Sequence, residues 1–263
     1  MRFNFGGFAL VSRIFWYELK RLIFNRLFLA LIIITGLYSY MTLSREIILG
    51  IAFTAPFSPW SFGTYLAGVL PLLILTLLFF ITFMYSNHEK LIRQLTFATP
   101  VDTFKLGLVK CASFATGFLI ISLFVALLGM AFFAILFRFY HFSDFFIPII
   151  ITLIPAMLFA LGAGLLLGSK NAYLLYVLMV AALLLGFLPG FLPRFMPVPA
   201  FFDLFGSSLF CTYPLTLPLG LDGEPAFTLP ISFVLGRLFF SAAGALMILF
   251  GLKRYARTSE SSC

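Results

Sequence analysis

This chain of 263 residues contains few charged side chains: Asp, Glu, Lys and Arg together account for 10% of it. Soluble domains carry about 25% charged residues, because polar groups have to cover a surface that faces water. Hydrophobic residues make up 62% of the sequence, and 37 residues are phenylalanine. The composition excludes a disordered chain, a disulfide scaffold and a nucleic-acid-binding domain, and it indicates a polytopic membrane protein.

Histidine, cysteine and intramembrane carboxylates are also scarce, which leaves little material for an active site. His88 and His141 fall in loops on opposite sides of the predicted membrane, which excludes an intramembrane metalloprotease or Ser–His protease. Cys111, Cys211 and Cys263 are far apart and predict neither a disulfide framework nor a metal site. No predicted span contains a pair of carboxylates, which disfavours a proton relay. With no GxxxxGK[ST] phosphate loop either, we expect no catalytic residue, metal or cofactor on this chain.

Six apolar stretches are each long enough to cross a bilayer as a helix, which takes ~20 residues. They cover residues 27–43, 64–85, 111–137, 145–168, 172–192 and 229–252. All six are continuously apolar, whereas the strands of a membrane barrel alternate in polarity. Asp102 is suited to cap a helix that runs through Lys110 into the third stretch. The sequence therefore predicts a single all-α transmembrane domain over 1–263, with six transmembrane helices.

The cationic residues predict how this domain is oriented, because Lys and Arg are retained on the cytoplasmic side of a membrane. Of the 17, thirteen lie before the first span, between spans two and three, between spans four and five, or after the last span. These are Arg2, Arg13, Lys20, Arg21, Arg26, Lys90, Arg93, Lys105, Lys110, Lys170, Lys253, Arg254 and Arg257. Only Arg45, Arg138 and Arg194 lie on the opposite side. We therefore expect both termini to be cytoplasmic.

Residues 8–26, before the first span, have the period of an amphipathic helix. One predicted face carries Val11, Phe15, Trp16, Leu19, Leu22 and Ile23, and the other carries Arg13, Glu18, Lys20 and Arg21. This pattern predicts an interfacial helix whose apolar face enters the acyl boundary while its cations meet headgroups. Such a helix either anchors the first span or acts as an elbow that transmits force from a cytoplasmic partner.

A second short helix is predicted over 87–99, between spans two and three. Ser86 and Glu89 match a capping box at its start. Pro100 ends it, because the residue before a proline avoids helical geometry. Leu91 and Leu95 provide an apolar stripe. The helix is either a solvated connector or a docking element for the groove of a partner.

The connection over 193–228 contains six prolines and many phenylalanines, so it would not lie free in water. It is expected to form either short re-entrant or interfacial helices, one of them through residues 200–210, or a plain packed cap. Further along, Arg237 falls inside the last predicted span, where an ionisable residue is a functional candidate.

Two interpretations of Arg237 remain open. If it is buried, its partner is Asp203, Asp222, Glu224 or an anionic substrate headgroup. Alternatively, the span begins near Phe233 and the arginine extends outward to the interface.

Taken together, these features resemble the permease subunit of an ATP-binding-cassette (ABC) transporter of the second exporter class, the ABC-2 type membrane proteins. That family has six spans with both ends inside, an amphipathic elbow helix, a coupling helix between spans two and three, and re-entrant helices between spans five and six. Its local signature is a Glu leaving the second span, a Thr-Pro-Val-like turn and a following Lys. The matching residues are Glu89, Thr99, Pro100, Val101 and Lys110, whereas Lys90, Leu91 and Ile92 stand where the family often has Gly-Thr.

The resemblance implies a mechanism and partners. Two permease subunits, identical or different, would form a pathway for an amphiphile such as a lipid, a lipid-linked glycan, a peptide or a drug. ATP and Mg²⁺ would bind to separate cytoplasmic ATPase subunits, and the complex would lie among the lipids of a bacterial cytoplasmic membrane. The ATPase-coupling residues would be Glu89, Leu91, Arg93, Leu95, Pro100 and Lys110. The alternatives are a channel or scaffold that is not coupled to ATP, and a membrane-embedded enzyme.

Overall fold

The computed structural model describes residues 5–51, 54–86, 103–191, 199–218 and 225–260. Every regular element formed by these residues is helical. They are α1 (Phe5–Ile23), α2 (Arg26–Thr42), a π-helical turn (Leu43–Ile47), α3 (Pro59–Met84), α5 (Thr103–Phe137), a 3₁₀ turn (Phe142–Phe145), α6 (Phe146–Lys170), α7 (Tyr173–Phe191), α8 (Ser207–Thr212), a second 3₁₀ turn (Tyr213–Thr216) and α9 (Ile231–Glu260).

Five segments of the described chain are long and apolar enough to cross a membrane. They are Arg26–Ile47, Pro59–Met84, Thr103–Phe137, Phe142–Lys170 and Ile231–Ala256. An all-helical chain with five such segments agrees with the predicted class, a polytopic membrane protein. The stretch expected to form the fifth of six spans coincides with α7, which is apolar but shorter than the others.

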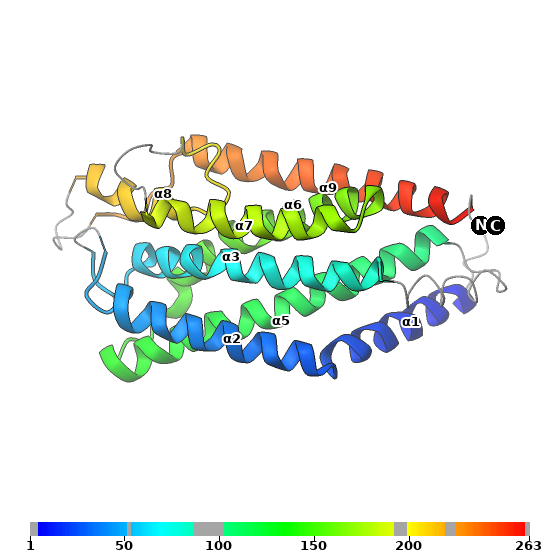
Figure 1. Cartoon of the computed structure of the whole chain (residues 1–263). Helices are drawn as coiled ribbons and strands as arrows, with labels where there is room; N and C mark the ends of the chain where they lie inside the picture. Colours follow the sequence, from blue (N-terminus) through cyan, green and yellow to red (C-terminus); the bar gives the residue numbers. More distant parts are fainter. Residues whose placement is uncertain (1–4, 52–53, 87–102, 192–198, 219–224, 261–263) are drawn as a thin grey trace.

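The long helices lie side by side, and their ends gather at two opposite ends of the molecule (Figure 1). One end, called here the basic end, contains the start of α1, the end of α3, the start of α5 and the end of α9. Its described cations are Lys105, Lys110, Lys170, Lys253 and Arg254. The other end, called the cap end, contains α8 and the segment 199–216. The described ends of the chain thus lie at the same end of the bundle.

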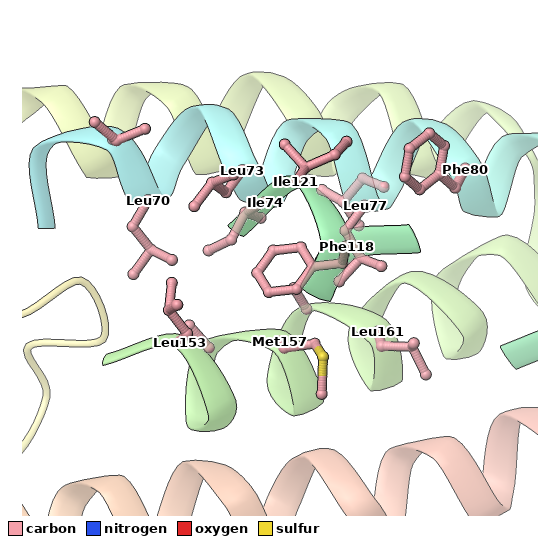
Figure 2. Close-up of a cluster of buried hydrophobic side chains, with 14 of the residues drawn as sticks. Leu70, Leu73, Ile74, Leu77, Phe80, Phe118, Ile121, Leu153, Met157 and Leu161 are labelled. Carbon is pink, nitrogen blue, oxygen red and sulfur yellow. The ribbon is translucent and has the colours of Figure 1, made fainter. Parts of the chain in front are cut away.

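The helix α3 occupies the centre of the bundle and contacts α2, α5, α6, α7 and α8. In its most apolar window 67% of the residues are buried, against 28% in α9. Figure 2 shows Phe118 of α5 reaching between side chains of α3, such as Leu73 and Leu77, and side chains of α6, such as Leu153 and Met157. Five described helices therefore pack around α3, while α1 packs mainly on α5 and α9 mainly on α6.

The outer helices expose apolar side chains that a water-soluble protein would bury. On α2 they include Leu29, Ile33 and Leu37, which are at least half exposed. Leu123 of α5 and Leu238 of α9 are exposed to a similar extent. Lipid tails solvate such side chains as well as a protein core does, so a bilayer is the environment that this surface fits.

Glycine residues allow the closest helix contacts. The most extensive helix pair is α6 with α9. A Cβ added at Gly162 of α6 would lie 2.5 Å from the carbonyl oxygen of Gly244 of α9. Gly168 packs against Tyr85 and Gly186 packs against Pro71, and a Cβ added at each glycine would overlap the ring that it faces. These glycines are thus used for packing within one chain.

The helix α1 packs its apolar stripe against α5 instead of turning it toward lipid. Leu19 and Leu22 are buried, and Gly117 of α5 makes room for Leu22, whose Cδ2 atom lies 2.6 Å from the position of an added Cβ. Trp16, expected on the same apolar face, is 66% exposed. Helical periodicity identifies an apolar stripe, but it does not distinguish a protein neighbour from a lipid neighbour.

Candidate functional site

Most of the predicted ATPase-coupling residues, namely Glu89, Leu91, Arg93, Leu95 and Pro100, lie outside the described residues, as does the predicted helix over 87–99. Lys110, the last of the set, is described. It lies in α5 near the basic end and is buried, with 4% of its surface exposed. The described helices that precede and follow the segment are α3 and α5, and the end of α3 and the start of α5 both lie at the basic end.

At the basic end, side chains connect α3 to its neighbours. Ser86, assigned to a capping box, donates its hydroxyl hydrogen bond to the carbonyl oxygen of Phe83 at 2.9 Å, within the last turn of α3. The hydroxyl of Tyr85 donates to the carbonyl oxygen of Leu165 in α6, also at 2.9 Å. The Tyr85 ring meets the edge of the Tyr255 ring of α9, with ring centroids 6.2 Å apart. The end of α3 is therefore fixed to α6 and α9 together.

The start of α5 joins the same set of contacts. Gly107 lies against α9, where an added Cβ would be 2.9 Å from Leu252 and 3.5 Å from Tyr255. Both of these α9 side chains are buried. The two helices that flank residues 87–102 thus contact the same turns of α9. A force applied to this connection would act on the ends of α3 and α5 and, through them, on α6 and α9.

At the opposite end, Arg237 lies in the second turn of α9 with only 3% of its surface exposed. Its Nη1 group donates a hydrogen bond to the carbonyl oxygen of Leu204. Its guanidinium carbon lies 4.4 Å from the centre of the Phe233 ring, within the range of a cation–π interaction. Among the described residues, Nε and Nη2 have no hydrogen-bond partner. The arginine is therefore enclosed by the 199–216 segment and does not extend outward.

Asp203 is the described carboxylate whose negative charge acts on this arginine. It is 4% exposed and accepts hydrogen bonds from the backbone N–H groups of Gly206 at 2.8 Å and Leu209 at 3.0 Å. Burial raises the pKa of Asp203 above its usual value, while these N–H groups and the charge of Arg237 oppose the shift. Of the three carboxylates considered as partners, the other two, Asp222 and Glu224, lie outside the described residues.

Two glycines allow the segment around Asp203 to lie directly on α9. Gly206 has a φ of +81°, a left-handed conformation that favours glycine, and an added Cβ would lie 2.9 Å from Nη2 of Arg237. Gly236 precedes the arginine, and its missing side chain leaves room for the carbonyl of Phe201. A buried cation, a buried carboxylate and close backbone contact together fix the segment to α9.

An aromatic cluster, which sequence reasoning did not identify, completes the cap end. Trp60, in the first turn of α3, donates its indole N–H to the carbonyl oxygen of Pro225 at 3.3 Å. Its ring lies 4.8 Å from that of Phe227, 5.9 Å from Tyr213 and 6.3 Å from Phe210, between ring centroids. The only signal in the sequence was the high aromatic content of 193–228. In the described part of this connection, the expected helix through 200–210 is replaced by α8, which begins at Ser207 and packs on the aromatic cluster through Phe210.

Within the described chain, no group of three His, Cys, Asp or Glu side chains is arranged to hold a metal ion. The described chain therefore offers two candidate functional features. One is the buried pair of charges at the cap end, Arg237 and Asp203, and the other is the set of contacts that joins the ends of α3, α5, α6 and α9 at the basic end.

No family model, curated protein or solved structure matches this chain. Its function consequently has to be inferred from its own residues and their arrangement.

Proposed function

We propose that the chain is the membrane-spanning permease subunit of an ATP-driven ABC exporter of the second class. A second permease subunit would complete the pathway for an amphiphilic substrate, and separate cytoplasmic ATPase subunits would supply the energy. The observation that carries the proposal is the set of contacts at the basic end. There the connection most suited to docking a partner joins α3, the central helix, to α5, and both helices contact α9.

Energy coupling requires that motion of a cytoplasmic partner reaches the helices that enclose the pathway. The hydrogen bond from Tyr85 to Leu165 and the contacts of Gly107 with Leu252 would transmit such motion to α6 and α9. The α1 helix supports the same idea, because Leu22 is inserted at Gly117 of α5 and would move with that helix.

The family arrangement also needs six spans with both ends on the cytoplasmic side. The helix α7 would be the span needed besides the five candidates, and it is the fifth in chain order. Its 19 residues rise by about 28 Å, close to the ~30 Å of hydrocarbon. The described cations support the orientation, because Lys105, Lys110, Lys170, Lys253 and Arg254 lie at the basic end, while Arg45, Arg138 and the buried Arg237 lie at the other end. The basic end would then face the cytoplasm, of a bacterial cell in the family to which the resemblance points.

The amphiphilic substrate is supported by the composition of the helices. The candidate spans are rich in phenylalanine and leucine, and the buried charge of α9 is engaged by Leu204 and Phe233 at the cap end. A hydrated ion would find few polar partners along such helices, whereas an amphiphile can follow them with its apolar part.

The proposal is tested by purifying the tagged chain from its native membrane in mild detergent. We expect a P-loop ATPase to co-purify in stoichiometric amount and to hydrolyse ATP. The Leu95→Asp variant would place a charge on the predicted docking stripe and should lose most of the bound ATPase. Leu95→Met, which changes the same residue but keeps the stripe apolar, is the matched control and should retain it.

Two results would contradict the proposal. One is a purified chain that carries no ATPase, which would leave an uncoupled channel, a scaffold or a membrane-embedded enzyme. The other is equal ATPase retention and equal export activity in Leu95→Asp, Leu95→Met and the unaltered chain, because coupling would then not depend on the stripe.

A further inference from the structure

The exposed face of α1 combines cations with large aromatic side chains. Five residues with successive spacings of three, one, three and four lie on the same side of a helix: Arg13, Trp16, Tyr17, Lys20 and Phe24. Trp16 is 66% exposed, Tyr17 67% and Phe24 79%. The opposite side of α1 is already occupied, because it packs on α5. The basic–aromatic face, as we call these five residues, is thus the surface that α1 offers to its surroundings.

The position of this face relative to the membrane follows from the chain connection. Only Phe24 and Asn25 separate α1 from α2, and Asn25 caps α2 by accepting a hydrogen bond from the Leu27 N–H at 3.1 Å. Leu27 and Leu29, in the first turn of α2, are exposed apolar residues of a candidate membrane span. Figure 1 shows α1 meeting the start of α2 at an angle, with α1 running from this junction toward the basic end of the molecule. The Phe24 end of the basic–aromatic face therefore lies within about one helical turn of the hydrocarbon boundary at Leu27, and Arg13 lies about 16 Å further along the helix.

The chemistry of the face matches the headgroup layer of an anionic membrane. Tyr and Trp side chains favour the boundary between hydrocarbon and water, and Lys and Arg side chains near it attract anionic lipids. Lys20 lies with its Nζ atom 5.8 Å from the centre of the Phe24 ring, so a cation is held close to an aromatic surface. Glu18, the acidic residue of this helix, is paired with Arg21 at 3.6 Å. The net charge that the face presents is positive.

We propose that the basic–aromatic face of α1 binds the headgroups of anionic phospholipids, and that it concentrates such lipids beside the start of α2. The cations contact the phosphate groups, and the aromatic rings lie at the level of the glycerol backbone. The inference requires that the chain spans a membrane, and it does not depend on an ATPase partner.

Tryptophan fluorescence provides the test, because the chain has two tryptophans in opposite environments. Trp16 is exposed on the face, whereas Trp60 is 1% exposed inside the cap. The full chain is placed in nanodiscs of phosphatidylcholine with a minority of phosphatidylglycerol. Two preparations of this composition are compared: in one, part of the phosphatidylglycerol carries bromine on its acyl chains, and in the other the same amount of phosphatidylcholine does. Subtracting the spectrum of Trp16→Phe isolates the Trp16 emission, and the Trp60 emission that remains reports whether the cap is intact.

We expect brominated phosphatidylglycerol to quench Trp16 more strongly than brominated phosphatidylcholine. Each Lys or Arg near an anionic surface strengthens its attraction about fivefold, so the preference should disappear in Arg13→Gln/Lys20→Gln. The matched control is Lys105→Gln/Lys253→Gln, which removes the same charge from exposed sites at the basic end and should keep the preference. High salt should reduce the preference in the unaltered chain, because it screens surface charges.

Three outcomes would overturn the proposal. Equal quenching by the two brominated lipids would mean that the face lies in the bilayer without recognising anionic headgroups. Quenching by neither lipid would mean that the face meets water or another protein. A preference that survives Arg13→Gln/Lys20→Gln would also count against it, because these cations are the groups assigned to the headgroups.

Discussion

The contact between α6 and α9 predicts that a single added methyl group destabilises the chain. Gly244 lies against the backbone of α6, where an added Cβ would be 2.5 Å from the carbonyl carbon of Leu158 and 2.6 Å from the amide nitrogen of Phe159. Carbon atoms in ordinary contact are about 3.5–4.0 Å apart, so the two helices would have to separate by about 1 Å. Because the obstructing atoms belong to the backbone, no side chain can rotate away to make room.

Two opposing effects determine the magnitude for Gly244→Ala. Replacing glycine by alanine inside a helix gains about 1 kcal/mol, because the unfolded chain has less conformational freedom to lose. Overpacking a tight contact costs about 1–3 kcal/mol. The overlap extends over three backbone atoms in the most extensive helix pair of the bundle, so we place the packing cost at the upper end of this range. The expected result is a net destabilisation of about 2 kcal/mol.

Thermal unfolding in detergent, followed by circular dichroism, measures this effect. Gly68→Ala in α3 is the matched control, because its added Cβ would meet only Cγ2 of Thr42, at the ordinary distance of 3.6 Å. Gly68→Ala should unfold at the same temperature as the unaltered chain or at a higher one, and Gly244→Ala at a lower one. If both variants were equally stable, the close approach of α6 and α9 would be refuted.

The cap end and the basic end each provide a further prediction. Asp203→Asn should destabilise the cap by about 1–3 kcal/mol, because one of the two oxygens that accept the N–H groups of Gly206 and Leu209 is replaced by a donor, and a red shift of Trp60 emission would report it; an unchanged spectrum would mean that the carboxylate is dispensable there. Tyr85→Phe removes the hydrogen bond to Leu165 without a change of shape and should lower the free energy of unfolding by about 1 kcal/mol, measured by thermal unfolding; an unchanged midpoint would show that the hydroxyl does not stabilise this end.

The apolar helices could be predicted closely because lipid solvation makes hydrophobic length a direct constraint. The first stretch, 27–43, matches α2 at Arg26–Thr42, and Asn25 caps it. The second was placed five residues too late, although Ser58 caps α3 and Pro59 occupies its first turn. These are standard start signals for a helix, and hydropathy alone does not detect them.

Contacts between distant segments could not be predicted in the same way. The sequence offered three carboxylates near Arg237, and only the folded chain shows that the backbone around Asp203 lies on α9. The close approach of α6 and α9 was also missed. Gly162 and Gly244 lie on different helices, and the spacing of residues along one helix does not predict which residue of another helix they will face.

The helix α3 connects the two ends of the molecule. Trp60, in its first turn, holds the aromatic cluster of the cap through Pro225, and Tyr85, directly after its last residue, is bonded to α6. Most side chains between them are buried, so α3 cannot shift without disturbing both ends. Pro71 lies midway and lacks a backbone N–H, which removes one hydrogen bond from the helix, and Gly186 of α7 packs on its ring. If motion at the basic end reaches the cap, α3 would therefore bend most easily at Pro71, and α7 would be the neighbour that follows.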